Sequence, residues 1–295
     1  MVTRDYITEV WTPIVNEPKF DNVTILNWVT DLSPFATDGA DTLHVPDIYT
    51  NTFSVQTQST QGNAVVDESV AQVDTTLAIN LHKYVAWIIG DKDMRQLASK
   101  YQLNEKYARE ARGLLLQAVE DSLFGLWSSI STNSVGDTVT VLSDFEIRSA
   151  ISALDSSNYE LDECAFFFHP TVYWKQLSGI AKYYEQQISN LNHIATGNFG
   201  KTGLTRNFKG SLYDIPVFTS SRVVSGLQTY RNLLLHKSAF GVAFQTMGAG
   251  MVRVQSDYLL TNLGTLAVAD VIYGVAVLRE PAAVLINANT TAVTS

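Results

Sequence analysis

The sequence predicts an α+β fold built from more than one lobe, and three observations predict it. Residues 73–89 alternate between apolar and polar side chains, which is the period of a half-buried strand. Residues 104–130 carry apolar side chains at spacings of three and four, which is the period of a helix about 40 Å long. Residues 131–289 mix short apolar runs with turn and helix-start signals. A chain of 295 residues is long enough to bury a sizeable core in two or three lobes.

The first 38 residues predict an N-terminal arm. Aromatic side chains stand in it at wide intervals, at Trp11, Phe20 and Trp28, with polar residues between them. Pro13 interrupts the short helical pattern around Trp11. Aromatic anchors on an irregular segment indicate a chain that lies on a surface, either its own or that of a neighbouring molecule.

Residues 39–72 predict a long, polar β-hairpin. Pro46 cannot donate to a central ladder, so the first strand lies at an edge or a bend, and residues 61–63 have the composition of a turn. A two-stranded hairpin is marginal in water by itself. We therefore expect its apolar partner to lie on another copy of the chain. The side chains expected to make this contact are Leu43, Val45, Ile48, Tyr49, Phe53 and Val55.

Residues 73–89 predict one long strand, or two strands with a bend, and residues 104–130 predict the long helix. On the strand, Lys83 alone interrupts the apolar face. Asp91 or Asp93 can cap the start of a helix. Further along, Ser143 and Glu146 form a capping-box pattern. The remaining expected elements are a buried strand at 165–168, a helix beginning at Pro170, strands at 215–218 and 233–235, a helix at 237–244, and strands around 252–254, 271–278 and 283–286.

Composition excludes several classes of function. The net charge of −9 and the isoelectric point near 5.0 argue against sequence-general binding of nucleic acid, which needs a basic face. The charged fraction of 17% is low against a usual level of about 25%. That is typical of a protein that hides surface in an assembly, although a large core gives the same numbers. No signal peptide and no apolar run of membrane-spanning length stand out, so we expect a soluble protein made in a reducing cytoplasm.

No motif in the chain predicts catalysis, a cofactor or a metal. Residues 195–202 match a loose phosphate-loop pattern, which leaves a nucleotide hydrolase using Lys201 as a further alternative, but the residues before them are polar and no helical pattern follows. A flexible loop is the better interpretation. The five histidines lack metal-ligand spacing, and Cys164 stands in an apolar run typical of a small buried side chain.

Five stretches, in the correct order, resemble the major capsid protein of tailed double-stranded DNA bacteriophages. The stretch GADTLHVPDI (39–48) resembles the start of that family's extended loop. The stretch QVDTTLAINLHKYVAWIIGDKD (72–93) resembles its return strand and the entry to its spine helix. Its spine helix is resembled by NEKYAREARGLLLQAVEDSLFGLW (104–127). Its late strands are resembled by GSLYDIPVFTSS (210–221) and NLGTLAVADVIYGVAVLREPAAVLI (262–286).

The resemblance implies the tailed-phage major capsid protein fold. Its parts would be an N-terminal arm at 1–38, an extended β-hairpin loop at 39–72, a peripheral domain with the spine helix at 73–130 and 251–295, and a mixed α/β axial domain at 131–250. It also implies that the arm clasps neighbouring subunits, with Trp11, Phe20 and Trp28 as contacts between subunits. A loop at the capsomer centre would contain Gly197, Gly200, Lys201 and Arg206.

The function implied is that of a structural subunit that self-assembles into hexamers and pentamers of an icosahedral shell around DNA. Its place would be the virion, assembled in the host cytoplasm, with portal, scaffold and cement proteins as further partners. Encapsulin-type nanocompartment shells share this fold and are the alternative. Some family members cross-link through a lysine in the extended loop, but no lysine or arginine lies between Gly39 and His82. We therefore expect a shell without that cross-link.

Overall fold

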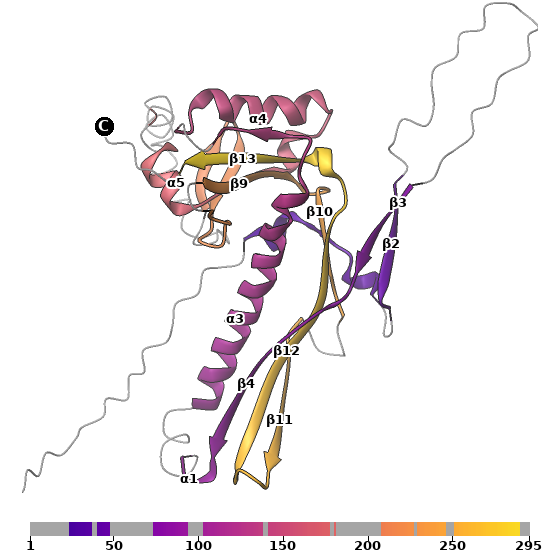
Figure 1. Cartoon of the computed structure of the whole chain (residues 1–295), viewed down its shortest axis with the longest axis vertical. Coiled ribbons are helices and arrows are strands. Elements are labelled where there is room, and N and C mark those ends of the chain that lie inside the picture. The colour runs from indigo at the N-terminus through magenta and orange to yellow at the C-terminus, as the bar shows by residue number, and fades with distance from the viewer. Residues whose placement is uncertain are drawn as a thin grey trace, which may run out of the picture.

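The computed structural model describes residues 24–36, 40–47, 73–93, 103–137, 141–177, 180, 208–226, 229–245 and 251–289. Their strands form a five-stranded sheet, a six-stranded sheet and a two-stranded sheet. Figure 1 shows the six-stranded sheet with its helices as a broad lobe at the top, and the five-stranded sheet as a long, tapering lobe below it. We call these the axial lobe and the peripheral lobe. The α+β fold expected from the sequence is confirmed.

The peripheral lobe is built around one long central strand, β12 (Gly264–Val277). It pairs with β4 (Leu81–Gly90) over ten residues, with β11 (Arg253–Leu259) and with β10 (Phe240–Phe244), all antiparallel. The short β1 (Thr30–Asp31) adds to β10 in parallel. The long helix α3 (Leu103–Gly125) runs beside β4 and β12 and continues into a 3₁₀ turn, η4 (Leu126–Ser129). The expected long helix is therefore confirmed, with its last turn tightened.

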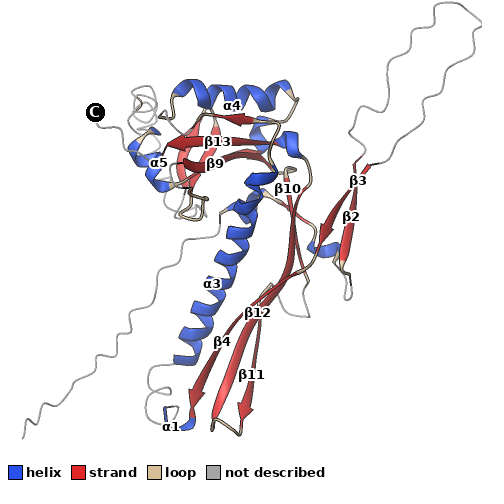
Figure 2. Ribbon diagram, viewed as in Figure 1, coloured by secondary structure: helices blue, strands red, loops and turns tan. Residues whose placement is uncertain are grey.

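The axial lobe contains a sheet in the order β5 (Ser134–Val135), β13 (Ala283–Asn289), β9 (Thr229–His236), β6 (Cys164–Phe168), β8 (Ile215–Thr219) and β7 (Phe208–Leu212). Helices α4 (Asp144–Ser156) and α5 (Pro170–Lys175) lie beside it (Figure 2). The capping box of Ser143 and Glu146 is present at the start of α4, and Pro170 begins α5, both as expected. The short 3₁₀ turns η5 (Leu161–Glu163) and η8 (Glu280–Ala282) lead into β6 and β13.

The axial sheet is buried on both faces at β6, which explains why that strand is uniformly apolar. Phe166 and Phe168 of β6 point into the cluster that contains Leu154 of α4. Phe167 points into the other cluster and meets Phe124 at the end of α3, with 6.1 Å between the ring centroids. The spine helix therefore joins the cores of the two lobes.

The hairpin base, made of β2 (Thr42–Asp47) and β3 (Val73–Ala78), lies beside the peripheral lobe. Of the short elements, η1 (Ile25–Trp28) packs into the main core through Ile25, η2 (Ser33–Phe35) follows β1, and the one-turn α1 (Asp91–Asp93) follows β4 at the far end of the lobe. β2 pairs only with β3 among the described strands, so the edge position expected from Pro46 is confirmed. β3 ends before β4 begins, which confirms two strands with a bend. At the crossing, a Cβ on Gly274 would lie 2.3 Å from the backbone oxygen of Ala78, so only glycine fits there.

The expected helix at 237–244 is wrong. Residues 237–239 form a turn, and 240–244 are strand β10. All five residues of β10 are buried, because Phe240 and Phe244 face the main core while Ala243 faces the small cluster around Leu77 and Ile79. A strand buried on both faces lacks the alternation that would reveal it in the sequence.

Two strands belong to the sheet of one lobe although the resemblance assigns their residues to the other. β10 lies in the range 131–250 but pairs with β12 of the peripheral lobe. β13 lies in the range 251–295 but pairs with β9 of the axial lobe. The chain therefore passes between the lobes more often than a simple division would require.

Candidate subunit interface

The end of the peripheral lobe carries exposed leucines in a tight turn. Residues 260–263 connect β11 to β12, and Leu260 and Leu263 are 80% and 65% exposed. Leu263 also has a φ of 45°, in the left-handed region that a large side chain enters only under strain. Turns usually carry small polar residues, so two exposed leucines here are unusual. We call Tyr258, Leu260 and Leu263 the apolar tip.

The face of the peripheral sheet that points away from α3 carries a second exposed set. Tyr84, which is 69% exposed, and Ile88 stand on this face of β4. Beside them, Arg253 donates two hydrogen bonds to Asp270, from Nε to Oδ1 at 3.0 Å and from Nη2 to Oδ2 at 2.6 Å, and His82 Nε2 lies 3.0 Å from Oδ2. The bonds from Arg253 hold the pKa of Asp270 below its usual range, against the opposing effect of burial. This face therefore presents an aromatic and an aliphatic side chain beside a compensated ion pair.

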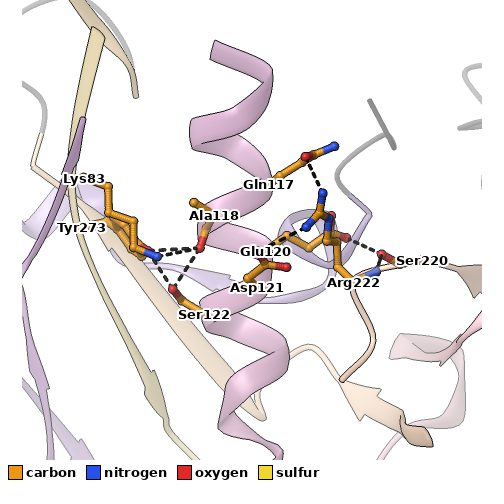
Figure 3. A network of polar contacts seen from close by, with 9 residues as sticks. All are labelled: Lys83, Gln117, Ala118, Glu120, Asp121, Ser122, Ser220, Arg222 and Tyr273. Carbon is orange, nitrogen blue, oxygen red and sulfur yellow. Dashed lines mark hydrogen bonds and ion pairs between the residues drawn. The ribbon is translucent and has the colours of Figure 1, made fainter. Parts of the chain in front are cut away.

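The opposite face of the sheet is fastened to α3 by polar contacts. The backbone oxygen of Ala118 accepts hydrogen bonds from Lys83 Nζ at 3.3 Å, from Ser122 Oγ at 3.0 Å and from the Tyr273 hydroxyl at 3.2 Å (Figure 3). The Lys83 ammonium also lies 5.9 Å from the centroid of the Tyr273 ring. Lys83, the one interruption of the apolar strand face, thus bonds to the helix that covers that face.

The other side of α3 is fastened to the arm and to the axial lobe. Glu120 is fully buried, and its Oε1 accepts from the backbone and side chain of Thr24 at 3.3 and 3.2 Å and from Ser220 Oγ at 3.3 Å. Arg222 donates to Gln117 Oε1 at 2.6 Å. Figure 3 shows Gln117, Glu120, Ser220 and Arg222 on the side of the helix opposite Lys83. The helix is therefore held in register by directional bonds on two sides.

The base of the extended hairpin keeps its apolar side chains half-buried. Leu43 packs against the small cluster around Leu77, and Val45 is half-buried on the same face. On the other face, His44 Nδ1 lies 2.6 Å from Asp74 Oδ2 across the ladder, and both side chains are exposed. The alternation expected from the sequence is present, and Leu43 and Val45 keep part of their surface exposed. Their contact with another subunit stays a prediction.

Trp28 lies against its own chain as well. Its ring packs at 5.7 Å from the Phe218 ring, and the Lys237 ammonium lies 5.6 Å from its centroid. It remains half-buried. Its expected role as a contact between subunits stays a prediction.

Other predicted site residues lie outside the described part of the chain. These are the arm and hairpin residues Trp11, Phe20, Ile48, Tyr49, Phe53 and Val55, and the loop residues Gly197, Gly200, Lys201 and Arg206. The phosphate-loop pattern at 195–202 lies outside it too. Sequence reasoning missed the apolar tip and the pair Tyr84 and Ile88. The tip had a signal, since LLTNLG places leucines on both sides of a polar pair.

Cys164 and His169, whose side chains are of types that often carry chemistry, have structural roles in the described part of the chain. Cys164 is buried, which confirms the small buried side chain expected from the sequence. Burial, followed by the charge of Glu163, raises its pKa to about 12. His169 caps α5 by accepting the Thr171 N–H at 3.2 Å, and burial lowers its pKa.

In the described ranges, no three His, Cys, Asp or Glu side chains gather as metal ligands. None of the helices described is both long and apolar enough to cross a membrane.

Comparisons with solved structures find the same architecture from end to end. A structure from Mycobacterium phage Che8 matches with a TM-score of 0.73 and 16% identity, over 97% of this chain and 98% of that one. The capsid of the cyanophage P-SCSP1u matches with a TM-score of 0.67 and 14% identity, over 96% and 93%. A holo-SrpI encapsulin complex from Synechococcus elongatus matches with a TM-score of 0.61 and 12% identity, over 96% and 93%.

Comparison at the level of sequence gives no match, either to a protein-family model or to a curated protein. The similarity is therefore one of structure, and it extends over nearly the whole length of both chains. This chain has the fold that phage capsid proteins share with an encapsulin.

Proposed function

We propose that this chain is the structural subunit of an icosahedral viral capsid, and that its copies assemble into hexamers and pentamers that enclose double-stranded DNA. The observation that carries the proposal is the match to a phage structure over 97% of this chain and 98% of the other. Nearly all of this chain therefore has a counterpart in that phage structure.

The exposed apolar surfaces support assembly from many small contacts. The apolar tip, the pair Tyr84 and Ile88, and the open sides of Leu43 and Val45 lie on separate parts of the subunit. Each buries a modest area, worth roughly 25 cal/mol per Å² of apolar surface. A closed shell adds many such contacts per subunit, so each one can stay weak enough to be reversed during assembly.

The charge supports enclosure of DNA without a grip on its sequence. With a net charge of −9, the chain offers no general attraction to phosphate groups. The capsomer-centre role of the loop at Gly197–Arg206, the assembly in the host cytoplasm, and the portal, scaffold and cement partners follow from the resemblance and belong to the same proposal. The role needs no cofactor and no catalysis.

Imaging of the expressed full-length chain tests the proposal. We expect closed particles with pentameric and hexameric units in electron micrographs. Particles recovered from the natural source should contain DNA that survives nuclease treatment. A chain that stays monomeric at every concentration and in every buffer would refute the proposal.

An encapsulin-type nanocompartment is the second candidate, because the SrpI complex matches over 96% of this chain. It makes a different prediction about contents. Source particles would hold a cargo protein, visible as a second band of fixed stoichiometry, and no nuclease-protected DNA.

A further inference from the structure

Three connections join the peripheral lobe to the axial lobe in the described chain. Residues 130–133 lead from α3 and η4 to β5, residues 237–239 lead from β9 to β10, and residues 278–282 lead from β12 to β13. Figure 1 shows β12 rising out of the peripheral lobe and turning into β13. Any change in the angle between the lobes has to bend these connections.

One carboxylate ties the first of these connections to the third. Glu280 Oε1 accepts four hydrogen bonds from residues 131 and 132: from Ser131 N at 2.6 Å, Ser131 Oγ at 2.7 Å, Thr132 N at 2.8 Å and Thr132 Oγ1 at 2.9 Å. Asn133 adds a bond from its side-chain amide to the Pro281 oxygen at 3.1 Å. The connection after the spine helix is thus bonded at three successive residues.

The third connection is also tied to the second. The backbone N–H groups of Leu278 and Arg279 both donate to the Ala239 oxygen, at 2.8 and 3.1 Å. Residues 278–281 therefore contact both other connections. Of these ties, only the one through Glu280 carries a charge.

The partners of Glu280 form a small anion site. Two successive backbone N–H groups with two hydroxyls converge on one oxygen, which is the arrangement of an anion-binding nest. The Ser131 hydroxyl, the Ser131 and Thr132 N–H groups and the Thr132 hydroxyl lower the pKa of Glu280 to about 2, against the opposing effect of burial. The side chain is partly open to solvent, so a free anion could reach the nest if the carboxylate were absent.

We propose that Glu280 is an intramolecular latch: its carboxylate occupies the Ser131–Thr132 nest and fixes the angle between the two lobes, and without it the nest binds a free carboxylate such as acetate. The latch belongs to the single subunit. Its consequence for a shell rests on the proposed function. In such a shell, subunits without the latch would adopt a wider range of angles between their two lobes and would build particles of mixed size.

Hydrogen–deuterium exchange on the dissociated full-length subunit tests the latch without requiring assembly. In Glu280→Ala we expect faster exchange in peptides that cover 130–133 and also 278–283, with β6 unchanged. Sodium acetate should slow the exchange again, and sodium chloride at the same ionic strength should not. Asp155→Ala, which removes an exposed acid from α4, is the matched control and should exchange like the parent.

Glu280→Gln serves as the second variant, and also replaces Glu280→Ala if that variant fails to fold. Its amide oxygen can accept the same bonds without charge, so its exchange should fall between parent and alanine. Faster exchange confined to residues 131 and 132, or equal effects of acetate and chloride, would overturn the latch. Particle diameters, measured afterwards, test only the consequence for the shell, so a failure of assembly would count against the proposed function and leave the exchange result intact.

Discussion

Replacing the two leucines of the apolar tip should weaken assembly while leaving the fold intact. Leu260 and Leu263 are 80% and 65% exposed in the single chain. Full burial of a leucine side chain is worth roughly 2 kcal/mol, so covering them by another copy adds roughly 1.6 and roughly 1.3 kcal/mol. Their joint removal then costs about 3 kcal/mol per contact, which is roughly a 100-fold change in an association constant.

The choice of substitutions separates assembly from folding. Leu263 has a φ of 45°, where asparagine is tolerated far better than leucine. The double variant Leu260→Ser/Leu263→Asn should therefore unfold at the same temperature as the parent or at a higher one. Thr261→Ala, in the same turn and also exposed, is the matched control.

The assay is the lowest protein concentration at which particles form, followed by light scattering and checked by sedimentation. We expect that concentration to rise steeply in the double variant and to stay unchanged in the control. If the double variant assembles at the parent's concentration, the tip is not buried in the shell and the reasoning from its exposure is wrong.

Three further predictions concern the contact of Glu280 between the two lobes, the crossing of β3 and β12 at Gly274, and the composition of the extended hairpin. Gly274→Ala should destabilise the subunit by about 1–3 kcal/mol, because the new Cβ meets the β3 backbone, whereas Gly125→Ala, with no atom within 4 Å, should not destabilise it; urea unfolding compares them. The contribution of Glu280 should be complete above its ordinary pKa of 4.5 and should disappear as the pH falls through about 2, so the difference in unfolding temperature between parent and Glu280→Gln should shrink over that range and stay constant at higher pH. Mature particles boiled in detergent should run as single chains on a gel, since no lysine lies between Gly39 and His82, and a ladder of covalent oligomers would contradict this.

The strongly periodic elements could be predicted from the sequence because each buries one face. The alternation of residues 81–90 matches the exposed and half-buried positions of β4, and the three-and-four spacing of 104–125 matches α3. The sequence does not separate β10 from a helix, because a short apolar run that is buried on both faces fits a strand or a buried helix segment equally well. The place of β13 in the axial sheet could not be predicted either, since its apolar run fits a buried strand in any sheet.

The polar contacts that Glu120 makes from α3, and those that Glu280 makes between the lobes, could not be predicted from the sequence either. Glu120 reads in the sequence as one more charge on a helix, yet it is fully buried against Thr24 and Ser220, which are far away in the chain. Glu280 gives no signal beyond a proline after it. In both cases the partners come from distant segments, and only the fold brings them together.

The placement of these polar groups fits the demands of a closed shell. Apolar burial is not directional, so an apolar core alone would leave α3 free to slide or rotate by small amounts against β4 and β12. Bonds to the Ala118 carbonyl on one side and through Glu120 on the other fix its position along both lobes. In the proposed shell, an angular error inside one subunit would be repeated by every copy and would change the curvature of the whole particle. We infer that directional bonds set the shape inside the subunit, and that weak apolar contacts, which can break and form again, join one subunit to the next.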